Sequence, residues 1–223
     1  AALVREKAAR GERTVLGLAT GSTPIGVYRE LIRLHRDEGL SFATVTSFNL
    51  DEYWPMAPDS VHSYHRYMWE NLFAHVDVNP AHVHLPPGHL DRAATEAAAA
   101  EYERAIREAG GIDFQLLGIG KTGHIGFPRE AVTMGVATIL AAREIAILAT
   151  GEHKAAIVRR AVEGEVDHEV AATFLQRHPN VTFYVDEAAA ADLTRVATPW
   201  LLDEVRWDEA LTVRAVVWLA LRT

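Results

Sequence analysis

The chain has 223 residues, 49% of them hydrophobic, and contains no cysteine, which excludes disulfide frameworks and thiolate chemistry. Its formal net charge of -8 argues against a nucleic-acid binder, because affinity for the phosphate backbone depends on clustered Lys and Arg. With no signal peptide and no long apolar span, we expect a single α/β domain over residues 1–223 that lies in the cytoplasm and not in a membrane.

Residues 1–10 are typical of a helix, and because no strand precedes them we expect an N-terminal strand to be missing from the sequence. Residues 14–20 form an apolar run typical of a buried strand, and a helical pattern extends from 25 to about 37. This order of strand, turn and helix is the repeating unit of a parallel α/β sheet.

The first turn contains Gly21, Ser22, Thr23 and Pro24. Pro24 suits the first helical position, and Ser22 or Thr23 could cap the helix. The N–H groups at a helix N-terminus also favour an anion, so this turn is either an ordinary cap or an anion site.

A second strand is predicted over residues 44–50, and it ends at two carboxylates, Asp51 and Glu52. Side chains alternate between the faces of a strand, so only one of the two should point into a given pocket. We expect one carboxylate to be functional and the other to be structural or solvated. Such residues often form turns or caps, but a carboxylate near a reacting carbon can also act as a general base.

The helical stripe within residues 60–75 is predicted to face the core, and its members are Tyr64, Tyr67, Met68, Leu72 and Phe73. The histidines near it are not joined by cysteine or by a compact acidic cluster, so no metal site is expected. Residues 91–110 are rich in alanine and are predicted to form a helix that covers the sheet.

The central feature is the apolar run over residues 114–127, which breaks into glycines and presents His124. We interpret it as a buried parallel strand that delivers His124 to a ligand at its carboxyl end. Residues 118–123 match the spacing of a dinucleotide fingerprint, but Pro128 follows closely where a helix is required. A phosphate loop is excluded because its first glycine would fall at Gln115.

The last third predicts strands at residues 145–150 and 181–185 and a helix from 151 to about 162. Lys154 lies near the start of this helix, where it is either a solvated lysine or a cation that meets a phosphate. The tail over residues 198–223 is amphipathic and rich in tryptophan, and we expect it to form packing surface.

Five blocks of residues occur in the order of the signature blocks of a known family. They are LATGSTP at 18–24, FNLDEY at 48–53, GIGKTGHIGF at 118–127, GEHK at 151–154 and LQRHP at 175–179. Together the blocks resemble the glucosamine-6-phosphate deaminase (isomerase) family, and the resemblance covers residues 14–186. It implies an open, Rossmann-like, mostly parallel α/β sheet with helices on both faces and the site at the strand carboxyl ends.

The resemblance also implies a reaction in which glucosamine 6-phosphate and water give fructose 6-phosphate and ammonia, without a metal or an organic cofactor. It implies that Asp51 removes the C2 proton of the opened sugar, and that His124, with Thr122 as its partner, serves ring opening. The positions that match the family's phosphate site are Gly21, Ser22, Thr23 and Lys154. An amino sugar phosphate is thus the expected partner, and a homo-oligomeric state stays open.

The chain departs from the family pattern at two places. Thr122 stands where family members usually carry Asp or Asn. After Phe127 the family continues with Asn-Glu-Pro and several tens of residues that include an arginine for the phosphate, whereas here Pro128 follows at once. Glu130 aligns beyond that stretch and is not taken as the missing glutamate. We expect that a segment between Phe127 and Pro128 is omitted from the sequence, with a natural deletion as the alternative.

Two other functions share parts of this pattern. A hydrolase of the 6-phosphogluconolactonase type has the same fold but needs no base at C2, and the FNLDEY block argues against it. A non-catalytic sugar-phosphate sensing domain would keep the phosphate turn and lose catalytic groups, and the departure after Phe127 is the feature that favours it.

Overall fold

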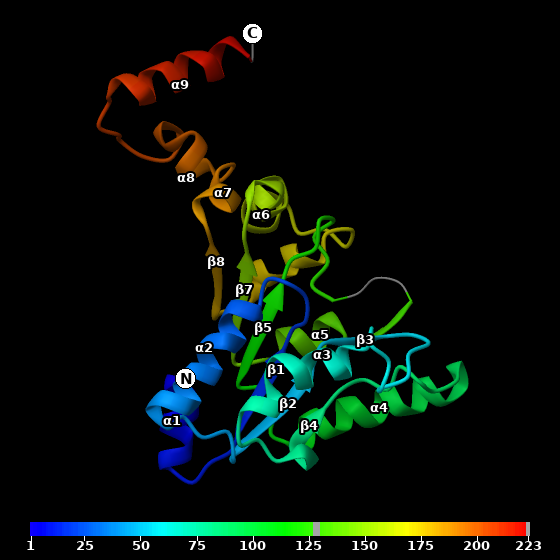
Figure 1. Cartoon of the computed structure of the whole chain (residues 1–223). Helices are drawn as coiled ribbons and strands as arrows, with labels where there is room; N and C mark the ends of the chain where they lie inside the picture. The colour runs from blue at the N-terminus through cyan, green and yellow to red at the C-terminus, as the bar shows by residue number, and fades with distance from the viewer. Residues whose placement is uncertain (127–129, 222–223) are drawn as a thin grey trace.

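A six-stranded sheet forms the centre of the protein in the computed structural model, which describes residues 1–126 and 130–221. Every neighbouring pair of strands is parallel, which confirms the predicted fold class. The strands, in spatial order, are β4 (Val83–His84), β2 (Val45–Asn49), β1 (Thr14–Leu18), β5 (Phe114–Gly118), β7 (Glu144–Ala149) and β8 (Val181–Val185) (Figure 1).

Helices cover both faces of this sheet because neighbouring residues of each strand are buried on opposite sides. Leu116 belongs to the core shared with α1 (Ala2–Ala9), α2 (Ile25–Glu38) and α3 (Tyr64–Asn71). Leu117 belongs to the core shared with α4 (Arg92–Glu108), α5 (Val136–Leu140) and α6 (Ala155–Glu163). Strands buried on both faces are continuous apolar runs, which is the pattern the sequence has. Short 3-10 helices connect these elements: η1 (Phe73–His75), η2 (Pro80–His82), η3 (Glu152–Lys154) and η4 (Ala171–Arg177).

A second, two-stranded sheet begins after β2, with only Leu50 between the two strands. In it β3 (Asp51–Tyr53) pairs antiparallel with β6 (Ala131–Thr133), so that Asp51 lies opposite Thr133. The sequence predicts that the strand stops before Asp51, whereas the chain stays extended through Tyr53. The alternation of side chains therefore continues through both carboxylates.

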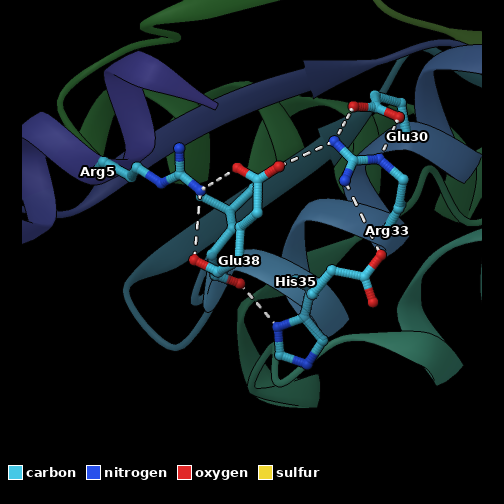
Figure 2. Close-up of polar contacts among 7 residues, drawn as sticks. Arg5, Glu30, Arg33, His35 and Glu38 are labelled. Carbon is cyan, nitrogen blue, oxygen red and sulfur yellow. Dashed lines mark hydrogen bonds and ion pairs between the residues drawn. The ribbon is translucent and has the colours of Figure 1, made fainter.

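Two groups of ion pairs fix the first helix to the rest of the fold. At the surface, Glu38 lies between Arg5 of α1 and Arg33 of α2, and Arg33 also binds Glu30 (Figure 2). These residues are exposed, so each pair contributes little. At the start of β5, the buried Asp113 accepts hydrogen bonds from Lys7 Nζ at 2.6 Å, from the Arg143 guanidinium and from the backbone N–H of Val15 at 2.8 Å.

The C-terminal region extends beyond the sheet, as Figure 1 shows. It contains α7 (Glu187–Ala190), α8 (Thr194–Ala197), η5 (Pro199–Leu201) and α9 (Glu209–Ala220). Trp200 packs against Trp207 and Trp218, with ring centroids 5.9 and 6.2 Å apart. The expectation that the tail is packing surface is met in part, because these rings pack together and Ala215 is buried, whereas Val213 and Leu219 are each 57% exposed. No helix within the described ranges has the length and apolar character needed to cross a bilayer.

Candidate active site

A cavity of about 220 Å³ opens where the chain direction across the sheet reverses. From β1 the chain continues to β2 and β4 on one side, and it then returns to β5, β7 and β8 on the other. In open α/β sheets this switch point is where ligands bind. The cavity is lined by residues 19–23 after β1, by Leu50 and Asp51 after β2, by residues 118–120 and 124–126 after β5, and by Tyr64 of α3.

A larger hollow of about 610 Å³ lies between α6 and the C-terminal region. Its two arginines already have carboxylate partners, since Arg159 faces Glu163 at 3.6 Å and Arg160 binds Asp167 at 2.6 Å. The smaller cavity collects a carboxylate, an imidazole and a helix N-terminus at the strand ends. We therefore assign the candidate site to the smaller one.

The turn over residues 20–24 places Gly21, Ser22 and Thr23 along the cavity wall, as the anion-site interpretation requires. Gly21 has a φ of +96°, a conformation that glycine adopts without steric cost. The predicted cap is wrong: in the described chain Pro24 occupies the N-cap position of α2, and no side chain caps this helix. Ser22 and Thr23 line the cavity instead, and the first turn of a helix carries free N–H groups that favour an anion.

Asp51 and Glu52 have the separate roles that strand alternation predicts. Asp51 is 5% exposed and lines the cavity. Glu52 is 3% exposed, and its carboxylate accepts the backbone N–H groups of Tyr64 at 2.8 Å and His65 at 2.9 Å. Because these N–H groups begin α3, Glu52 has a structural role, whereas Asp51 lines the cavity, and its role as the functional carboxylate stays a prediction.

His124 lies across the glycine-rich loop after β5, with its Nδ1 2.9 Å from the Thr122 hydroxyl. A Cβ added at Gly120 would lie 2.0 Å from the imidazole ring, so the ring occupies space that only glycine leaves open. Burial, and then the positive charge of Lys154, lower the pKa of His124. The neutral imidazole is thus favoured, and Nε2 is the nitrogen that accepts a proton when Nδ1 is held as the N–H donor.

Lys154 lies at the start of α6 and reaches the same loop, where its Nζ donates to the Ile119 carbonyl at 2.6 Å. Burial, and then the charge of Lys121, lower the pKa of Lys154. Lys154 itself does not line the cavity, but it binds the carbonyl of Ile119, which does, and its charge acts on His124. Whether Lys154 meets a phosphate stays a prediction.

Tyr64 is the cavity residue that sequence reasoning missed. Helical spacing places it in the core stripe of α3, but its side chain lines the cavity, while Met68 and Leu72 of the same stripe are buried in the core. Tyr67 packs against the same core as predicted, and its hydroxyl donates to the Gly21 carbonyl at 2.6 Å. The capping serine, Ser63, marks Tyr64 as the first helical residue and is the signal that could have placed it at the strand ends.

The junction between Phe127 and Pro128 lies outside the described residues. The expectation of a segment missing at that point, with the glutamate and arginine it would carry, therefore stays a prediction. Within the described loop, Thr122 is the polar partner of His124 that replaces the expected Asp or Asn.

Residues 1–131 match the family described as glucosamine-6-phosphate isomerases/6-phosphogluconolactonase. The chain is 42% identical to a glucosamine-6-phosphate deaminase of Halothermothrix orenii, over 80% of this chain and 87% of that protein. It is 43% identical to a glucosamine-6-phosphate deaminase of Rhodopirellula baltica, over 88% of this chain and 91% of that protein. A solved structure of a monomeric glucosamine-6-phosphate deaminase superposes with a TM-score of 0.78 at 38% identity, covering 85% of this chain and 90% of that one.

Each of the two sequence alignments is longer than the number of residues that this chain contributes to it. The Halothermothrix orenii alignment extends over 212 residues, whereas 80% of the 223 residues here is about 178, a difference of about 34. The Rhodopirellula baltica alignment gives about 35 by the same comparison, from 231 residues and 88%. The relatives therefore contain residues without a counterpart in this chain.

Proposed function

The chain belongs to the family of glucosamine-6-phosphate isomerases and 6-phosphogluconolactonases, and within it we propose that this protein converts glucosamine 6-phosphate and water into fructose 6-phosphate and ammonia. The observation that carries the proposal is the presence of Asp51, His124 and the turn over residues 20–24 around one cavity. An anion site, a proton shuttle and a carboxylate base are the three elements that this reaction needs at fixed separations.

The phosphate of the substrate binds at the turn over residues 20–24. The N–H groups of the first helical turn and the hydroxyls of Ser22 and Thr23 supply hydrogen bonds, and the helix N-terminus favours the negative charge. Lys154 supplies a positive charge from the opposite side of the loop. Binding the phosphate here fixes the C6 end of the sugar.

Ring opening is the first chemical step, and His124 performs it. The neutral imidazole accepts the proton of the C1 hydroxyl at Nε2 and returns it to the ring oxygen as the C1–O5 bond breaks. The Thr122 hydroxyl, 2.9 Å from Nδ1, holds the ring orientation during this transfer. The product is the open-chain aldehyde, with its C2 proton made acidic by the neighbouring carbonyl.

Asp51 then removes the C2 proton, and the electron pair of the C2–H bond forms a C1–C2 double bond while the C1 carbonyl oxygen takes a proton from the ammonium group on C2, which gives a neutral enolamine. Return of the proton to C1 produces a fructose imine at C2. Water adds to this imine, the C2–N bond breaks, and ammonia leaves with the proton that water supplies. The carboxylate thus serves twice, first as a base and then as an acid.

A lactonase needs to activate water at a carbonyl and makes no use of a base at C2, so Asp51 favours the deaminase over that alternative. The same carboxylate and imidazole argue against a domain that only senses the sugar phosphate. The substrate is a small metabolite, and for that reason we place the reaction in the cytoplasm.

The experiment is the release of ammonium and fructose 6-phosphate from glucosamine 6-phosphate by the purified protein, with both products quantified. We expect a stoichiometry of one to one. Hydrolysis of 6-phosphogluconolactone is measured on the same preparation. Lactone hydrolysis without ammonium release would contradict the proposal, and the absence of both activities, with binding of the sugar phosphate retained, would favour the sensing domain.

A further inference from the structure

Tyr64 stands between the two ends of the candidate site. Its side chain lines the cavity together with Thr20 of the anion turn and with Asp51. Its hydroxyl is hydrogen-bonded to the Thr20 side chain and, at 3.3 Å, to the Tyr53 hydroxyl. The ring packs against that of Tyr53, with centroids 4.7 Å apart. The phenol is therefore positioned by the anion turn on one side and by the strand that carries the base on the other.

The backbone of Tyr64 is held as firmly as its ring. The Glu52 carboxylate accepts the N–H of Tyr64 at 2.8 Å, and Ser63 caps the helix by accepting the N–H of Arg66 at 3.0 Å. Since Glu52 follows Asp51 directly in β3, one strand fixes both the carboxylate base and the first residue of α3. The separation between Asp51 and Tyr64 is thus fixed by the fold, as is required of a residue that determines substrate specificity.

Tyr64 is a neutral hydrogen-bonding group throughout the physiological pH range. Burial, then the hydrogen bond with Tyr53, and also the nearby charge of Asp51, raise its pKa well above the ordinary value, and the contact with Thr20 only partly opposes them. The phenol donates its one hydrogen to the Tyr53 hydroxyl at 3.3 Å, so what it offers to a sugar hydroxyl is an oxygen lone pair that accepts a hydrogen bond.

The position of Tyr64 along the cavity identifies which hydroxyl it meets. In the proposed function, on which this inference rests, the C6 phosphate lies at residues 20–24 and C2 lies at Asp51. The carbon midway between C2 and C6 is C4, and Tyr64 lies near both ends, because it contacts Thr20 of the turn and lines the cavity together with Asp51. We propose that the Tyr64 hydroxyl binds the C4 hydroxyl of the open-chain substrate and selects its configuration.

Glucosamine and galactosamine 6-phosphates differ in configuration at C4 alone, so they report on this contact directly. The test is the ratio of kcat/KM for the two sugars, measured for the wild type, for Tyr64→Phe and for Tyr67→Phe. In Tyr64→Phe the ratio should move toward one by about 3- to 10-fold, the loss expected for one uncharged hydrogen bond. Tyr67 is the matched control because its hydroxyl binds Gly21 in the anion turn, and the phosphate is common to both sugars. Tyr67→Phe should change both kcat/KM values by the same factor.

A fall in kcat/KM that is equal for both sugars in Tyr64→Phe would overturn the inference and leave Tyr64 a structural residue. Calorimetric binding of the two reduced, open-chain amino alditol 6-phosphates separates this failure from that of the proposed function, because it needs no turnover. If neither alditol phosphate binds the wild type, both proposals are wrong. If they bind and Tyr64→Phe leaves their affinity ratio unchanged, only the assignment of Tyr64 is wrong.

Discussion

Asp51 and Glu52 allow a matched pair of substitutions, because the same chemical change is made one residue apart in one strand. Asp51→Asn removes the proposed base while keeping the size and hydrogen-bonding ability of the side chain. Removal of a general base typically costs about 10²- to 10⁴-fold in rate, so we expect kcat to fall by at least 100-fold. Because Asp51 is 5% exposed and faces the cavity, loss of its charge should leave the unfolding temperature unchanged or raise it.

Glu52→Gln should have the opposite balance of effects. The Glu52 carboxylate accepts two N–H groups at the start of α3, at 2.8 and 2.9 Å, and a glutamine oxygen replaces only one of these acceptors without charge. The loss of one charge-assisted hydrogen bond costs about 2 kcal/mol. For a chain of this size that corresponds to a fall in the unfolding temperature of about 4–8 °C.

The assays are ammonium release at saturating glucosamine 6-phosphate, thermal unfolding, and exchange of the C2 proton with deuterium oxide followed by NMR. Asp51→Asn should bind substrate but show no C2 exchange, whereas Glu52→Gln should exchange C2 within about 10-fold of the wild-type rate, a loss smaller than that of a missing general base. Persistent exchange in Asp51→Asn would refute its assignment as the base. A loss of exchange in Glu52→Gln as large as that in Asp51→Asn would refute the division of roles between them.

Three further outcomes follow from the geometry. Burial and the charge of Lys154 hold the pKa of His124 below its ordinary value of 6.5, so the acid limb of the pH profile of kcat/KM should lie below that pH. Lys154→Gln should shift this limb to higher pH. If the limb does not move, His124 does not set it. The Cβ of Gly120→Ala would lie 2.0 Å from the His124 ring, so this variant should lower kcat by about 100-fold while circular dichroism shows an intact fold. Gly26→Ala, whose Cβ would have no atom within 4 Å, should raise the free energy of unfolding by about 0.5 kcal/mol, as denaturant unfolding would show. Burial raises the pKa of Asp113, but hydrogen bonds from its cationic and backbone partners outweigh this and lower it, so its contribution is present above the unfolded pKa near 3.8 and is lost as the pH falls through the folded value. Asp113→Asn should cost about 3 kcal/mol at pH 7 and progressively less as the pH falls below 3.8, as a series of urea unfolding curves at decreasing pH would show.

Local patterns in the sequence determine much of this fold. The apolar runs at 14–20, 114–118 and 145–150 are strands because both of their faces are buried. The alternation of side chains along a strand is enough to assign Asp51 and Glu52 to opposite sides. The cavity follows from the order of the strands, since the loops after β1, β2 and β5 meet at the switch point.

The features that the sequence does not reveal depend on contacts between distant segments. The pairing of β3 with β6 joins residues about 80 positions apart, and nothing in either short segment specifies the other. Tyr64 has the periodicity of a core residue, but its place in the first turn of α3 brings it to the strand ends, where the cavity and not the core is its neighbour. Helical periodicity identifies which face of a helix is apolar, but it gives no information about what the residues at the end of the helix contact.

The small sheet of β3 and β6 bears on how this family can change in length. Asp51 lies opposite Thr133, and the Trp54 N–H donates to the Glu130 carbonyl at 2.8 Å, so residues 130–133 are clamped to β3. Residues inserted ahead of that clamp lengthen a closed loop, and each doubling of loop length costs only about 0.6 kcal/mol in closure entropy. A change in chain length ahead of the clamp should therefore cost little and leave the Asp51 carboxylate in place, which makes this point of the chain suitable for engineered insertions.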